Sequence, residues 1–145
     1  MLRQFLVGAT VSACTIVIHA MIMTTVVRVA HEVRAQAIGW AWLKLAAIMI
    51  TTASVLMVAH VCEVIVWAIS YDIVNAVPEG TAHMYFAFVN YTTLGYGDIT
   101  PVPRWQLLGP MTAMNGILLF GWSTAVIFEV LRKAMLLMEP ATAQT

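Results

Sequence analysis

Three apolar stretches of this chain are long enough to cross a lipid bilayer, and they constrain the fold more than any other feature. They run from about Phe5 to Val27, from about Leu43 to Ser70 and from about Trp105 to Leu131. Each exceeds the roughly 18 residues that a membrane-spanning helix needs. Because a helix satisfies its own backbone hydrogen bonds within lipid, we predict three transmembrane helices.

The composition narrows the class of protein further. Of the 145 residues, 61% are hydrophobic and 10% are charged, whereas soluble domains carry about 25% charge. We therefore expect a membrane protein and not an enzyme. The formal net charge is zero, which argues against a nucleic-acid partner because such binding needs a basic face. Cys14 and Cys62 fall inside apolar runs, which favours small core residues over a disulfide or a zinc site.

The basic residues predict the orientation. Five of the seven flank one side of the membrane, and Arg3 and Arg104 flank the other; the five are Arg28, Arg34, Lys44, Arg132 and Lys133. Basic residues concentrate on the cytoplasmic side. We thus predict a multi-pass protein of the cell (inner) membrane, with the N-terminus outside and the C-terminus in the cytoplasm.

The segment between the second and third stretches contains a shorter apolar run. Pro78-Glu79-Gly80 could open a helix, and Ala82 to Tyr91 is aromatic and too short to span, as in a re-entrant helix. Thr92-Thr93-Leu94-Gly95-Tyr96-Gly97-Asp98 follows. The glycines permit torsions that other residues resist, so this loop can point successive carbonyls the same way. Along a water-filled path, such carbonyls can replace the water around a cation, and the C-terminal end of a short helix adds negative charge.

This motif resembles the selectivity filter of the tetrameric potassium channel superfamily, and the resemblance covers roughly residues 43–132. It implies an all-α membrane protein with three transmembrane helices, a re-entrant pore helix and a filter loop, assembled as a homotetrameric pore. The implied domains are an additional N-terminal helix and cytoplasmic connection (1–42), a pore domain (43–133) and a short cytoplasmic tail (134–145).

The resemblance also implies which residues handle the ion. K⁺ ions would bind to the filter, and no organic cofactor is expected. The backbone carbonyls that bind the ions would come from four consecutive residues: Thr93, Leu94, Gly95 and Tyr96. Gly97 would shape the outer mouth of the filter. The Thr93 hydroxyl would close the innermost site. Leu94 occupies a filter position at which valine is the commoner residue in this superfamily.

Three further residues are expected to support the filter. Asp98 would lie behind it, and Tyr85-Phe86 occupies the place where many relatives have paired tryptophans. The first span is additional to the two-helix template, so the resemblance assigns it no role. No span carries repeated arginines, which excludes a voltage-sensor helix.

The third span holds candidates for a cavity or a gate. Its polar residues would line a water-filled cavity, and its glycines would let the helix bend. Alternatively, all of these residues serve only the packing of one helix against another. The candidates are Thr112, Asn115, Gly116 and Gly121.

Ionisable residues within the spans are costly in lipid and therefore suggest function. His60 and Glu63 are three residues apart on one helical face, and His19 lies in the first span. The pair is interpreted as either structural or pH-sensing. A metal site is the weaker alternative, because two ligands and a distant histidine fall short of a usual set.

These observations predict a potassium-selective channel that conducts K⁺ passively, with membrane lipids and identical subunits as partners. Two alternatives remain open. One is a weakly selective monovalent cation channel, and the other is an accessory or sensor subunit that does not conduct.

Overall fold

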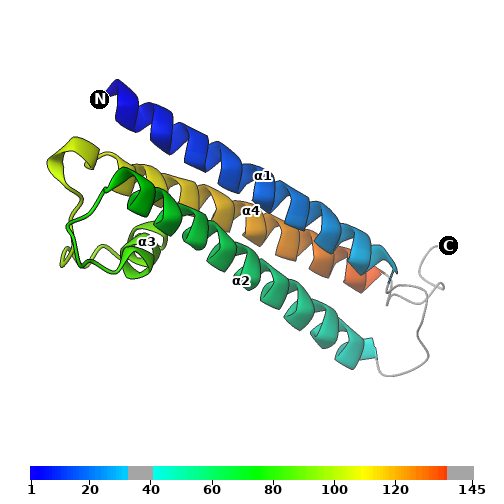
Figure 1. Ribbon diagram of the computed structural model, residues 1–145. Coiled ribbons are helices and arrows are strands. Elements are labelled where there is room, and N and C mark those ends of the chain that lie inside the picture. Colours follow the sequence, from blue (N-terminus) through cyan, green and yellow to red (C-terminus); the bar gives the residue numbers. More distant parts are fainter. Residues whose placement is uncertain (33–40, 137–145) are drawn as a thin grey trace.

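The computed structural model describes residues 1–32 and 41–136. Its elements are α1 (Leu2–Glu32), α2 (Ala41–Val74), the short α3 (His83–Tyr91), a 3₁₀ turn η2 (Pro103–Trp105) and α4 (Leu108–Leu136). The described residues form no strand. The all-α architecture is therefore confirmed. The long helices α1, α2 and α4 lie side by side, with α3 at one end of the bundle (Figure 1).

All three long helices are apolar enough to span a membrane, which confirms a membrane protein. The candidate spans are Leu2–Val26, Trp42–Val74 and Pro103–Leu136. The 34 residues of α2 make a helix of about 51 Å, longer than the roughly 30 Å hydrocarbon core, so α2 must tilt or protrude. Both cysteines are free and lie on the outside of the single chain. The prediction of buried cysteines is thus wrong for one chain, because spanning helices expose apolar residues to lipid or to other chains.

The packing of α1, which the sequence left open, is now defined. α1 lies along α4 and α2 (Figure 1). A Cβ built on Gly8 would lie 2.4 Å from Sδ of Met111, so the absence of a side chain at this position allows close approach. Leu107 donates its backbone N–H to Oε1 of Gln4 at 2.9 Å. The N-terminus is therefore held at the same end of the bundle as the start of α4.

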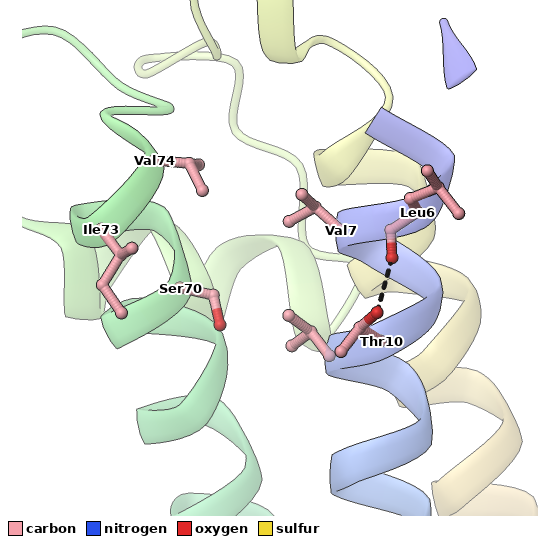
Figure 2. Close-up of a pocket in the computed structure, with 7 residues that line it drawn as sticks. Leu6, Val7, Thr10, Ser70, Ile73 and Val74 are labelled. Atoms are coloured by element: carbon pink, nitrogen blue, oxygen red, sulfur yellow. Dashed lines mark hydrogen bonds between the residues drawn. The ribbon is translucent and has the colours of Figure 1, made fainter. Parts of the chain in front are cut away.

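An apolar groove separates α1 from α2 near that end. Its volume is about 340 Å³. Figure 2 shows Val7 of α1 and Val74 of α2 pointing into the space between the two helices, while Thr10 donates its hydroxyl to the Leu6 carbonyl at 2.8 Å. The lining residues are Leu6, Val7, Thr10, Val11, Ser70, Ile73 and Val74.

α2 ends in a tight backbone turn that redirects the chain toward α3. Asn75 has φ 51°, and the N–H of Ala76 reaches back to the Tyr71 carbonyl at 2.9 Å. A left-handed residue with this hydrogen bond is a common helix ending. Pro78-Glu79-Gly80 forms a turn and does not begin the helix, because α3 starts later, at His83.

Candidate functional site

The predicted short helix is confirmed as α3, His83–Tyr91. Its nine residues extend about 13 Å, too little to cross a bilayer. Phe86 and Tyr91 are buried, and the Phe86 ring lies 5.0 Å from that of Tyr71 on α2. The aromatic residues thus hold α3 between α2 and α4. Phe86 acts in this packing, and its support of the loop stays a prediction.

The loop after α3 alternates in backbone handedness. φ is positive at Thr93 (60°), Gly95 (58°) and Gly97 (76°), but not at Leu94 or Tyr96. The sign of φ thus alternates from residue to residue, whereas it stays negative along a strand. A positive φ is uncommon for a β-branched residue such as Thr93. The loop is therefore neither helix nor strand, and its backbone torsions change from one residue to the next.

Backbone hydrogen bonds join the loop to the end of α3. Thr93 donates its N–H to the Asn90 carbonyl at 3.0 Å, and Leu94 donates to the Val89 carbonyl at 2.9 Å. These bonds satisfy carbonyls that every helix leaves unpaired at its C-terminus. The position of α3 therefore sets the position of the loop.

The rest of the loop is exposed in the single chain. Every residue from Thr92 to Asp98 is exposed, and Tyr96 retains 67% of its surface. The loop therefore makes few contacts within its own chain beyond those at its two ends.

One side-chain hydrogen bond braces the far end of the loop. Tyr85 donates its hydroxyl to Oδ2 of Asp98 at 2.8 Å. This bond raises the pKa of the Tyr85 hydroxyl, because the neighbouring carboxylate disfavours a phenolate. Two of the three residues predicted to support the filter, Tyr85 and Asp98, are therefore in direct contact.

Two polar residues of α4 bond to other helices of the same chain. Asn115 accepts hydrogen bonds from Thr15 of α1 at 2.9 Å and from Trp67 of α2 at 3.0 Å. Thr112 bonds to the Tyr71 hydroxyl. This differs from the prediction that Thr112 and Asn115 line a cavity. Both are buried, and the Thr112 hydroxyl and Oδ1 of Asn115 are used where the helices meet. Nδ2 of Asn115 has no hydrogen-bond partner among the described residues.

The two glycines of α4 have different surroundings. A Cβ on Gly116 would lie 2.0 Å from the Tyr91 carbonyl oxygen, whereas one on Gly121 would meet no atom within 4 Å. Gly116 is therefore needed for the close approach of α3 to α4, as the packing alternative predicted. Gly121 stays a candidate bending point.

A buried polar cluster joins α1, α2, α3 and α4. Nδ1 of His19 lies 2.7 Å from Oε1 of Glu63, and Nδ1 of His60 lies 3.1 Å from Oε2. The Tyr91 hydroxyl donates to the same carboxylate, and Oγ of Ser123 lies 3.0 Å from Nε2 of His60. The sequence indicated the pair on α2. It missed Tyr91 and Ser123 and gave no sign that His19 joins the pair, because their contact depends on how the helices pack.

Comparison with known proteins supports a single family. The family described as "Ion channel" matches residues 13–133, from within α1 to near the end of α4. Searches of curated proteins and of solved structures gave no match.

Proposed function

We propose, from the premise that the chain belongs to the ion channel family, that it forms a potassium-selective channel. The single observation that carries this proposal is the backbone of the loop from Thr93 to Gly97. This loop lies between two membrane-spanning helices, and the sign of φ alternates along it. We infer that this alternation turns successive carbonyls toward one side, where they would suit a dehydrated monovalent cation. In this proposal K⁺ is the transported ion, and it passes down its electrochemical gradient.

The carbonyls of four residues would bind the ions: Thr93, Leu94, Gly95 and Tyr96. The Thr93 hydroxyl would close the innermost site, and Gly97 would shape the outer mouth. The hydrogen bond between Tyr85 and Asp98 would hold the loop at a fixed distance from α3. A fixed distance keeps the carbonyls from closing around a smaller ion, so the brace favours K⁺ over Na⁺.

One loop lies on one side of an ion and cannot surround it. A ring of loops requires several chains about a common axis, and the resemblance implies four. The exposed surface supports this proposal: Ile117 of α4 retains 62% exposure and Phe128 retains 66%. We infer that some of these apolar residues contact neighbouring copies and that others contact lipid.

The tetramer is directly testable. Native mass spectrometry of the protein purified in mild detergent is expected to give four chains per particle. A monomer or dimer that still conducted K⁺ after reconstitution would contradict the proposed pore.

The orientation is proposed from charge. The N-terminus and the segment between α2 and α4 lie at one end of the bundle (Figure 1), which we place outside the cell. The first connection and the tail would lie in the cytoplasm, although residues 33–40 and 137–145, which include Arg34, are outside the described residues. Residues 43–133 would form the pore domain, with the N-terminal helix packed against it.

Cysteine labelling tests this orientation. In a Cys14→Ala, Cys62→Ala background, Glu79→Cys is expected to react with an impermeant maleimide only from outside the cell. Arg28→Cys is expected to react only after the membrane is opened, because Arg28 lies at the end of α1 that is far from the N-terminus. The reverse pattern would contradict the orientation.

A further inference from the structure

The buried cluster combines the donor types that hold transition metals. His19 and Glu63 have no exposed surface, and His60 retains 9%. We propose that His19, His60, Glu63 and Tyr91 form a binding site for a transition-metal dication such as Zn²⁺, which ties α1 and α2 to the last residue of α3. The proposal is independent of ion conduction.

The four donor atoms lie close together. Donor atoms of the two histidines and Glu63 all lie within 4.8 Å of one another. The Tyr91 hydroxyl oxygen lies 2.9 Å from Nδ1 of His60 and bonds to Glu63. In tetrahedral zinc sites the metal–ligand distances are about 2.0–2.2 Å, which places ligand atoms roughly 3.3 Å apart. The 2.7 Å between His19 and Glu63 therefore needs only a small expansion to admit the ion.

The remaining ring nitrogens are held as those of metal ligands usually are. Nε2 of His60 lies 3.0 Å from Oγ of Ser123, and Nε2 of His19 lies 3.4 Å from the same atom. Metal-bound histidines almost always donate their other N–H to a carboxylate, a backbone carbonyl or water, which fixes the tautomer. The Ser123 hydroxyl oxygen would take this role here. If both rings donate to Ser123, both Nδ1 lone pairs point at the carboxylate and phenol oxygens. A cation between these atoms would then accept both Nδ1 lone pairs, in place of the hydrogen bonds that join the two rings to Glu63 and Tyr91.

Charge balance favours a dication in this position. Two neutral imidazoles, one carboxylate and one phenolate carry a total charge of minus two, which a dication cancels. Binding releases the Tyr91 hydroxyl proton to water. A neutral assembly avoids the large cost of an uncompensated charge within the membrane. Zn²⁺ fits this set because it accepts histidine nitrogen and carboxylate oxygen in tetrahedral geometry.

The site would act on the pore loop through Tyr91. This residue ends α3, and the adjacent backbone carbonyls of Val89 and Asn90 hold the loop. A metal here would lock α3 to α1, which gives the additional N-terminal helix a role in positioning the loop.

The test is metal binding by the purified full-length protein in detergent, in a Cys14→Ala, Cys62→Ala background. Elemental analysis after Zn²⁺ loading and desalting is expected to give one zinc per chain. The zinc content of the His19→Asn variant is expected to fall below a tenth of that amount. Ser123→Ala is expected to weaken Zn²⁺ binding by ~10–100-fold. His83→Asn is the matched control, because His83 lies outside the cluster beside Asp72, and it should keep one zinc per chain.

A second variant gives a new signal instead of a loss. With Co²⁺ in place of Zn²⁺, His19→Cys is expected to show a thiolate-to-cobalt charge-transfer band in the near ultraviolet, which the parent lacks. No zinc in the parent, equal zinc in parent and His19→Asn, or no such band would each overturn the proposal and leave a purely hydrogen-bonded cluster. None of these readouts uses ion flux, so a failure here is distinct from a failure of the proposed channel.

Discussion

Gly95→Ala is expected to abolish K⁺ conduction or its preference over Na⁺ while leaving the tetramer intact. Gly95 has φ 58°, a conformation that costs an L-residue roughly 1–2 kcal/mol. The cost recurs in each of the four proposed subunits, and the loop can avoid it only by turning a peptide group away from the ion path. An added Cβ would meet no atom of the same chain closer than 3.9 Å, so the fold should tolerate it. Flux into liposomes and native mass spectrometry measure the two effects separately.

Gly80→Ala is the matched control. Gly80 also has a positive φ, 77°, and an added Cβ meets nothing within 4 Å. The backbone strain is therefore comparable, but the residue lies in the turn before α3. Conduction should be retained in this variant. Unchanged selective flux in Gly95→Ala would show that ions do not pass this loop.

Gly116→Ala is expected to give the largest loss of stability. The added Cβ would lie 2.0 Å from the Tyr91 carbonyl oxygen and 3.0 Å from its carbonyl carbon. Backbone atoms at the end of α3 cannot rotate aside as a flexible side chain can, so α3 and α4 must separate. Overpacking of this kind typically costs about 1–3 kcal/mol, and we expect the upper end of that range.

Thermal unfolding in detergent micelles measures this effect. Gly121→Ala serves as the control, because an added Cβ there meets no atom of its own chain within 4 Å. Gly116→Ala should unfold at a clearly lower temperature than both the parent and the control. If Gly116→Ala were as stable as the parent, α3 would not rest on α4 at this glycine.

The elements with strong local signals could be predicted from the sequence. Length and apolarity identify the three spans, and the aromatic run ending at Tyr91 identifies α3. The glycines at 95 and 97 indicate a loop with unusual torsions, and positive φ values occur there. The positive φ of Thr93 carried no such signal, because a β-branched residue rarely adopts it.

The faces of the helices could not be predicted in the same way. A span that is apolar around its whole circumference does not indicate which side meets a neighbour. Asn115 therefore resembled a cavity residue, whereas it bonds to Thr15 and Trp67 on two other helices. His19 seemed remote from Glu63 for the same reason: their contact depends on the packing of α1, which no local pattern specifies.

The central claim is that the loops of this chain alone make a potassium-selective path. The most direct test is the flux of K⁺ and of Na⁺ from liposomes that contain only the purified protein, under equal and opposite gradients. We predict K⁺ flux that greatly exceeds Na⁺ flux and that disappears in liposomes containing Gly95→Ala. Equal flux of the two ions would indicate a weakly selective cation channel, no flux of either would indicate an accessory subunit, and each result would contradict the account.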